Sequence, residues 1–157
     1  MKLNLGCGVR PIGGYINHDK TNHSHFVDQV WDLEVLPWPW GGEAIEHIKA
    51  FDVFEHLRPW KLGVEDWMGE CWRILRFGGL LEMRLPASDH PNHYGFRDPT
   101  HCRLFTHESM DYFCPEEPSR LHEEFGFYYF GENYGRWWKK ESVTRDSWDW
   151  LFRLRKI

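Results

Sequence analysis

A single strong helical period, at residues 62–75, is the feature that most limits how this chain can fold. Apolar side chains recur there at helical spacing and form one stripe, namely Val64, Trp67, Met68, Cys71, Trp72 and Leu75. Acidic residues precede basic ones along the segment, which is the order that the helix dipole favours, and Gly78-Gly79 is expected to end the helix. Elsewhere short apolar runs alternate with turn residues. The pattern predicts an α/β chain in which strands outnumber helices.

Short apolar runs that end at turn residues predict the strands. We expect strands at residues 2–5, 15–18, 29–31, 45–51 and 80–85, followed by an antiparallel pair formed by residues 123–134 and 148–157. Two prolines and two glycines within residues 36–42 predict a loop. Residues 87–106 predict a long polar loop, which is usually functional in a compact domain, and Thr106 is expected to cap a short helix to Phe113. The sheet is predicted to be parallel in its first part.

Composition places the chain among single-domain globular proteins. Its 157 residues, 19.0 kDa, suffice for one domain, which we take as residues 1–157. Aromatic residues make up 17% of the chain, which excludes a disordered protein because so much apolar surface must be buried or bind something. We find no apolar run that predicts a membrane span and no signal peptide at the N-terminus. The four cysteines form no C-x-x-C pair, so we expect reduced thiols and a cytoplasmic location.

Charge is unevenly distributed along the chain. The formal net charge of −5 argues against binding to duplex nucleic acid through the overall field. Residues 136–157 carry seven basic and three acidic side chains, a net charge of +4. This basic end, with its Trp137-Trp138 pair, could contact phosphate or an anionic glycan. We favour the alternative, in which these charges line the solvated face of a terminal hairpin.

A glycine turn and an acid follow the first two strands. Gly6-Cys7-Gly8 ends the first strand and Asp19 ends the second. Open parallel sheets bind ligands outside the carboxyl ends of their strands, where glycine lets a ligand approach the backbone. An acid at the end of the second strand is placed to accept hydrogen bonds from both hydroxyls of a ribose. Alone, Asp19 would be read as a strand-end cap, but the ordered set that continues with Asp32-Leu33 and Glu55-His56 favours a nucleoside site.

These blocks resemble the class I S-adenosylmethionine-dependent methyltransferases, in particular the methyltransferase domain 11-like group. The resemblance spans about residues 2–113 and is carried by five ordered blocks: Leu3-Asn4-Leu5-Gly6-Cys7-Gly8, Gly14-Tyr15-Ile16-Asn17-His18-Asp19, Asp32-Leu33-Glu34-Val35-Leu36-Pro37-Trp38, Glu55-His56-Leu57 and Arg73-Ile74-Leu75-Arg76-Phe77-Gly78-Gly79. The resemblance implies a Rossmann-like sheet, mostly parallel with an antiparallel terminal strand. It also implies methyltransferase activity with S-adenosyl-L-methionine as the cofactor.

The resemblance also implies a set of cofactor-binding residues. They are Gly6, Cys7, Gly8, Asp19, Asp32, Leu33 and Phe51. The glycine turn would pack along the methionine part of the cofactor, and Asp19 would hold its ribose. Asp32 and Leu33 would meet the adenine, with the acid accepting from the exocyclic amine. Phe51, at the end of the fourth strand, would lie near the sulfonium.

The chain departs from this family in two ways. Only residues 6–14 are available between the first two strands, where the family usually has a helix, and a parallel crossover normally needs a dozen or more residues. Pro11, Gly13 and Gly14 make an irregular loop the expected crossover. The chain also begins at the first strand, without the N-terminal helix that often covers the cofactor in relatives. We therefore expect an unusually open site, or a homo-oligomer in which a second subunit covers it.

A nicotinamide-dinucleotide site is the nearest competitor on fold. It requires G-x-G-x-x-G and an acid about 20 residues further on. Position 11 is proline, however, and Asp19 follows Gly6 after 13 residues. A loop of this length also leaves no helix N-terminus for a pyrophosphate. This interpretation is therefore disfavoured.

The candidate catalytic residues follow the fourth strand. They are Asp52, Glu55 and His56, which would fall on one side of a helical turn. A hydroxyl acceptor needs a proton acceptor within about 3 Å, so His56 is a candidate general base with Glu55 orienting it. The alternative is that Glu55 and His56 only fix the turn after the strand. Asp98 and His101, on the long loop, are a further polar pair that could face the substrate.

A metal site is a weaker hypothesis, and our primary assignment contains no metal. Asp52, Glu55, His56 and His90 resemble the carboxylate and histidine magnesium sites of some ribose methyltransferases that act on RNA ends. Oxygen ligands suit magnesium, whereas two histidines suit manganese or zinc better.

The sequence does not specify the methyl acceptor. We choose a hydroxyl of a small molecule or of a sugar or glycan, and tryptophan rings could stack on sugar rings or bases. The candidates for stacking are Trp38, Trp40, Trp137 and Trp138. The first alternative is a single-stranded RNA end bound by the basic C-terminal segment. The second is a cofactor-binding module without catalysis of its own.

Overall fold

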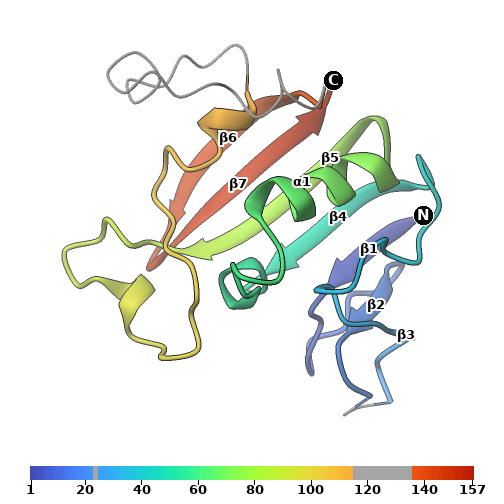
Figure 1. Cartoon of the computed structure of the whole chain (residues 1–157), viewed down its shortest axis with the longest axis horizontal. Helices are drawn as coiled ribbons and strands as arrows, with labels where there is room; N and C mark the ends of the chain where they lie inside the picture. Colours follow the sequence, from blue (N-terminus) through green and yellow to red (C-terminus); the bar gives the residue numbers. More distant parts are fainter. Residues whose placement is uncertain (23–24, 115–135) are drawn as a thin grey trace.

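In the part of the chain that the structure describes, a seven-stranded sheet with one α-helix on it forms the core (Figure 1). The computed structural model describes residues 1–22, 25–114 and 136–157. The strands are β1 (Lys2–Leu5), β2 (Ile16–Asp19), β3 (Gln29–Val30), β4 (Ile45–Phe51), β5 (Leu75–Pro86), β6 (Trp138–Asp146) and β7 (Asp149–Lys156). Their order in the sheet is β3-β2-β1-β4-β5-β7-β6. The first five strands are parallel, and β7 is antiparallel to both β5 and β6. The predicted fold class is confirmed.

The terminal hairpin is present, but its first strand is not the predicted one. Strand β7 lies within the predicted residues 148–157, and its hairpin partner is β6 at Trp138–Asp146. The predicted partner, residues 123–134, lies outside the described residues. Three cations of this hairpin, Lys140, Arg153 and Arg155, form ion pairs with acidic side chains. The basic segment is therefore partly neutralised within the fold.

The predicted helix is present, but the residues that end it are not the predicted glycines. Helix α1 spans Val64–Ile74, and β5 begins directly at Leu75. Gly78, with φ 72°, lies inside β5, where the pairing with β4 shifts register between Ile45 and His47. The Gly78-Gly79 pair therefore makes an irregularity in a strand. Pairing of Leu75 with Ile45 in the sheet ends the helix before the glycines are reached.

Short single turns replace further helices among the described residues. They are 3₁₀ turns at η1 (Phe54–His56), η2 (Tyr94–Phe96) and η3 (Asp111–Phe113). The helix predicted to begin at Thr106 is a series of turns that ends in η3, although the Thr106 hydroxyl does accept from the Glu108 N–H (3.4 Å). Within the described residues, no helix has the length and apolar content needed to cross a membrane.

The core lies on the face of the sheet that α1 covers. In β5, Leu81, Met83 and Leu85 are fully buried and alternate with Glu82 and Arg84 on the opposite face. That opposite face carries cross-strand ion pairs, such as Lys49–Glu82 (3.2 Å) and Arg153–Glu82 (2.7 Å). This alternation is typical of a sheet with one apolar and one polar face.

Most of the tryptophans proposed to stack on an acceptor belong to the core. Trp38, Trp40 and Trp138 are 2%, 5% and 1% exposed. The Trp38 side chain donates to the Leu33 carbonyl (2.9 Å), and the Trp40 side chain donates to Gln29 (2.9 Å). The prediction that they form an acceptor platform is wrong for these three residues, because their rings are buried in the core.

Candidate functional site

The link between β1 and β2 is a tight loop without a helix, as predicted. Gly6 and Gly8 adopt φ 61° and 53°, which side chains rarely tolerate. A Cβ built on Gly6 would lie 2.5 Å from a methyl carbon of Val53, the second residue after β4. The Cys7 N–H donates to the carbonyl of His18 in β2 (2.8 Å), so the turn is hydrogen-bonded directly to the second strand. Glycine is therefore required at position 6 by its backbone conformation and by the approach of Val53.

Asp19 holds this glycine turn against the end of β2. The Gly8 N–H donates to Oδ2 of Asp19 (2.9 Å), and the Thr21 N–H donates to Oδ1 (3.3 Å). The strand-end role weighed for this residue is therefore present in the structure. The same carboxylate also lines a cavity at the carboxyl ends of β1 and β2.

Two cavities meet at the glycine turn. The first cavity, of about 320 Å³, is lined on one side by Gly6, Asp19, Asp32 and Leu33. The second cavity, of about 530 Å³, is lined by Gly6, Cys7, Gly8 and Phe51 among others. Gly6 and Asp52 line both cavities. Every residue of the predicted cofactor-binding set thus lies at one or both of two adjoining cavities.

A network of charged residues that the sequence did not predict lines part of the first cavity. Lys20 pairs with Asp32 (3.0 Å). Although burial opposes the effect, the Glu34 N–H and Lys20 hold the pKa of Asp32 below its usual value. Arg58 binds the Glu34 carboxylate through its guanidinium, and the Arg58 N–H also donates to it (2.9 Å). This contact lowers the pKa of Glu34 to about 2. Glu34 and Arg58 are 24 positions apart, and no local sequence spacing predicts their pairing.

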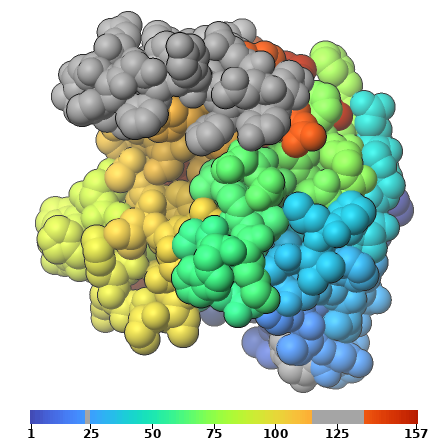
Figure 2. Space-filling view, viewed as in Figure 1, coloured from blue at the N-terminus to red at the C-terminus, as the bar shows by residue number. Residues whose placement is uncertain are grey.

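A third cavity opens beside the first two. It has a volume of about 470 Å³ and is lined by Asp52, Glu55, His56, Pro86, Tyr94, Arg97, Asp98, His101, Trp148 and Asp149. Asp52 lines all three cavities. Figure 2 shows the segment after β4, in green, lying against the yellow segment after β5, and the Cys102 N–H donates to the Glu55 carbonyl there (2.7 Å). The third cavity therefore lies where these two segments join.

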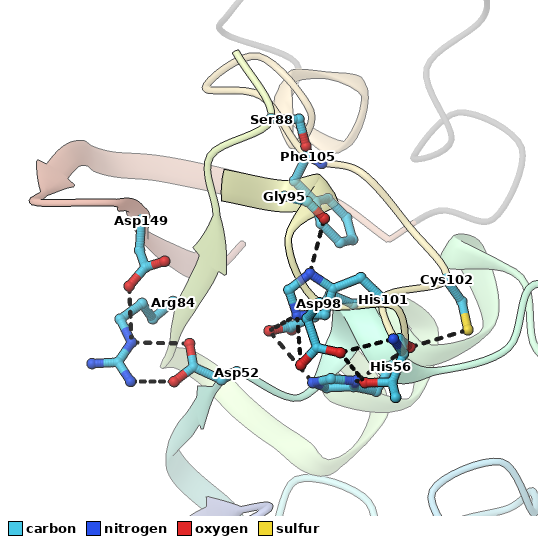
Figure 3. Close-up of polar contacts among 12 residues, drawn as sticks. Asp52, His56, Arg84, Ser88, Gly95, Asp98, His101, Cys102, Phe105 and Asp149 are labelled. Atoms are coloured by element: carbon cyan, nitrogen blue, oxygen red, sulfur yellow. Dashed lines mark hydrogen bonds and ion pairs between the residues drawn. The ribbon is translucent and has the colours of Figure 1, made fainter. Parts of the chain in front are cut away.

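Asp52 does not lie on the same side as Glu55 and His56, contrary to the prediction. Its φ is 59°, so the backbone leaves the helical spacing assumed for residues 52–56. Its carboxylate forms a two-point ion pair with Arg84, which also approaches Asp149 (3.6 Å). Figure 3 shows Asp52 pointing toward Arg84 and away from His56. Burial and the nearby Asp52 raise the pKa of Asp149.

Glu55 and His56 lie close together, as predicted. Glu55 faces Nε2 of His56, however, and a residue that orients a base acting through Nε2 must contact the other nitrogen, Nδ1. The His56 Nε2 lies 4.0 Å from Oε1 of Glu55. The opposite nitrogen, Nδ1, contacts the hydroxyl of Thr100 (3.1 Å), and that hydroxyl donates to Asp98 (2.6 Å). Thr100 and Asp98 therefore fix the His56 ring.

Glu55 is the most unusual titratable residue in the site. It is completely buried, and neither of its carboxylate oxygens has a hydrogen-bond partner. Burial raises the pKa of Glu55 to about 8. The Nε2 atoms of His56 and His101 each lie 4.0 Å from its Oε1. Burying a carboxyl without a partner is costly, and groups with shifted pKa values gather at functional sites.

His101, and not His90, is the loop histidine that joins this group. His90 is packed on the Tyr94 ring (centroids 4.5 Å apart) and accepts from the Asn92 N–H (2.9 Å). Among the described residues, the group of neighbouring potential metal ligands consists of Glu55, His56 and His101. The predicted metal set was therefore wrong at Asp52 and His90. The sequence did place His101 on a substrate-facing loop, but spacing could not predict its contact with Glu55.

Several solved structures similar to this chain are named methyltransferases. No protein-family model and no curated protein matches its sequence. A SAM-dependent methyltransferase from Archaeoglobus fulgidus superposes with a TM-score of 0.64 at 14% identity, over 99% of this chain and 85% of that one. A possible histamine N-methyltransferase from Thermotoga maritima gives 0.63 at 12% identity, over 99% and 82%. A putative methyltransferase from Haloferax volcanii, in complex with the Trm112 activator, gives 0.58 at 13% identity, over 98% and 81%.

The chain has the class I methyltransferase fold. The resemblance noted in the sequence is thus confirmed for the fold, whereas the domain 11-like group stays a prediction. In open α/β sheets, ligands bind at the carboxyl ends of the parallel strands. The three cavities of this methyltransferase fold lie there, beside the ends of β1, β2 and β4.

The glycine turn yields a first prediction. Replacing Gly6→Ala should lower the free energy of unfolding by about 1–3 kcal/mol, because alanine tolerates the positive φ poorly and its Cβ meets Val53. Gly13→Ala is the matched control, since its φ is not in the left-handed range and a Cβ there meets nothing within 4 Å. Urea unfolding measures both variants. Equal stability of the two would contradict the role assigned to the turn.

The Glu34–Arg58 ion pair yields a second prediction. Because pairing lowers the pKa of Glu34 from 4.5 to about 2, its stabilising effect is complete above about pH 4.5 and is lost as the pH falls toward 2. Glu34→Gln should therefore be less stable than the original protein near neutral pH, and the two should converge in acid. Urea unfolding measured between about pH 6 and pH 2.5 tests this. A stability difference that does not change with pH would contradict it.

Proposed function

We propose that this protein is an S-adenosyl-L-methionine-dependent methyltransferase that acts on a hydroxyl of a small molecule or sugar. One observation carries the proposal: the first two cavities adjoin at the glycine turn, and all seven residues expected to bind the cofactor line one or both of them. Their position at the strand ends is where this fold binds nucleosides. The methyltransferases among the similar structures support the same reading.

In this proposal the two cavities divide the cofactor between them. The first cavity takes the adenosine, with Asp19 accepting from the ribose hydroxyls and Asp32-Leu33 beside the adenine. The second cavity takes the methionine part, along the Gly6–Gly8 turn. Phe51 lies at that cavity, and an aromatic ring is a favourable neighbour for the positive sulfonium. The transferable methyl would then point toward Asp52, where the third cavity begins.

The third cavity would hold the acceptor. Its volume of about 470 Å³ suits a small molecule. Tyr94 and Trp148 stack at its edge, with ring centroids 5.1 Å apart, and Trp148 is 57% exposed. Such a surface is suited to the apolar face of a sugar ring. We assign to Tyr94 and Trp148 the role of stacking on the acceptor, in place of the buried tryptophans for which that role was predicted.

The reaction needs only alignment and a place for one proton. When bound, S-adenosylmethionine would supply an activated methyl group to the acceptor oxygen, with its sulfur keeping the electron pair of the broken bond, and the acceptor would have to lose a proton. We assign His56 as the group that takes this proton through Nε2, because its Nδ1 is held by Thr100. Asp52 would contribute through its pair with Arg84, at the junction of the three cavities. Excluding water and orienting the reactants supply the rest of the rate enhancement.

Cofactor binding can be tested at Asp19. Asp19→Ala should weaken the binding of S-adenosylmethionine by about 1–3 kcal/mol, because a charged hydrogen-bond acceptor for the ribose is lost. Isothermal titration calorimetry measures the change. Asp146→Ala, at the end of β6 and outside the three cavities, is the control. Since Asp19 also holds the Gly8 N–H, a thermal melt must show that the variant is folded. An unchanged affinity in folded Asp19→Ala would contradict the ribose assignment.

Catalysis can be tested at His56. The protein should transfer a labelled methyl group to at least one member of a panel of sugars and small hydroxyl compounds. His56→Ala should lower that rate by about 10²-fold or more, with a much smaller effect on cofactor affinity. His107→Ala, an exposed histidine paired with Asp89, is the matched control. Cofactor binding without transfer to any acceptor would contradict the proposal and favour a binding module. Transfer only to single-stranded RNA would instead favour the RNA alternative.

A further inference from the structure

The group formed by Glu55, His56 and His101 brings together more potential ligand atoms than a single general base requires. The three residues come from two segments, since Glu55 and His56 follow β4 whereas His101 lies on the loop after β5. One ligand atom from each residue lies within 4.8 Å of the other two. The rings of His56 and His101 approach at 69°, with centroids 4.9 Å apart. Figure 3 shows both rings beside Asp98, on the side of the site away from Arg84.

Hydrogen bonds fix the tautomer of both histidines. The His101 Nδ1 faces the Gly95 carbonyl (2.9 Å), which can only accept, so Nδ1 carries the proton. The His56 Nδ1 faces the Thr100 hydroxyl, whose own proton is committed to Asp98, and the Thr100 carbonyl (3.4 Å). Nδ1 is therefore the donor in His56 as well. In both imidazoles the other nitrogen, Nε2, faces Glu55 and is the atom that can offer a lone pair.

Three electron-pair donors thus surround one point. The buried Glu55 oxygens have no hydrogen-bond partner, and the Nε2 atoms of His56 and His101 approach the same oxygen. A proton on Glu55 could serve only one of the two imidazoles, and 4.0 Å is too long for that hydrogen bond. A cation would satisfy all three donors at once. Histidine ligands commonly donate their other N–H to a carbonyl or another fixed group, as both histidines do here.

We propose that Glu55, His56 and His101 bind one divalent transition-metal ion, for which Zn²⁺ is the natural probe. Two imidazoles and one carboxylate suit Zn²⁺ better than Mg²⁺, which prefers oxygen ligands alone. Ligand atoms around a tetrahedral zinc lie about 3.4 Å apart at the usual bond lengths. The two separations between Glu55 Oε1 and the imidazole Nε2 atoms are each 4.0 Å, and all three ligand atoms lie within 4.8 Å of one another, so the group would have to contract on binding.

The place of this site gives the metal a role, and that role rests on the proposed function. All three ligands line the third cavity, so a coordination position left open would face the acceptor. A metal held there would bind the acceptor oxygen and lower the pKa of its hydroxyl. With the metal bound, Nε2 of His56 would be a ligand instead of the proton acceptor of the metal-free reaction, and the acceptor proton would leave to solvent. Metal binding itself needs neither the cofactor nor an acceptor, so it can be tested separately.

The test is a calorimetric titration of Zn²⁺ into tag-free protein without S-adenosylmethionine. We expect one ion per chain, and an affinity that His101→Ala and Glu55→Gln each reduce by at least about tenfold. His107→Ala, also after β5, should bind as the original protein does, and Mg²⁺ should bind far more weakly. A zinc-soaked crystal, measured at the zinc absorption edge, should show an anomalous peak among the three side chains. This second readout needs no variant to fold.

Three results would overturn the proposal: no stoichiometric binding of Zn²⁺, binding that His101→Ala leaves unchanged in a folded protein, or an anomalous peak elsewhere. Mg²⁺ binding as tight as Zn²⁺ would overturn the choice of metal. Any of these results would leave the cofactor site intact, because its test is binding at Asp19. Loss of cofactor binding with normal zinc binding would contradict the methyltransferase proposal alone.

Discussion

The close approach of the glycine turn to the end of β4 is the constraint on which the site depends. Gly6 can lie against Val53 only because it has no side chain, and the turn then reaches β2 through the Gly8 N–H and Asp19. With so short a link, β1 and β2 pair in parallel without a crossover helix. No helix from this link covers the carboxyl ends of β1, β2 and β4, and the first two cavities form there.

Sequence reasoning predicted the features that depend on neighbouring residues. The strand at residues 45–51 has the observed bounds, and the period of α1 placed its buried side facing the sheet. The short crossover could be read from Pro11, Gly13 and Gly14. The seven cofactor residues line the cavities as the family pattern implied, although their contacts with a cofactor stay a prediction. A homo-oligomer, a single domain and a cytoplasmic location also stay predictions.

The errors came from contacts between distant segments. Pairing with Ile45 begins β5 at Leu75, so the Gly78-Gly79 pair could not be recognised as a strand irregularity. Asp52 was placed with Glu55 by helical spacing, whereas its left-handed backbone turns it to Arg84. His101 meets Glu55 only because the loop after β5 folds back onto η1 through the Cys102 N–H. No local spacing carries such information, and this is why the third cavity was the part least predicted.

A crystal structure with bound S-adenosylhomocysteine would test the central claim most directly. We expect the ribose hydroxyls within hydrogen-bond distance of Asp19, the adenine beside Asp32-Leu33, and the sulfur near Phe51, directed toward the third cavity. The glycine turn should keep its conformation, because the contact between the Gly8 N–H and Asp19 holds it. A nucleoside bound elsewhere, or cavities that remain empty at saturating ligand, would contradict the account.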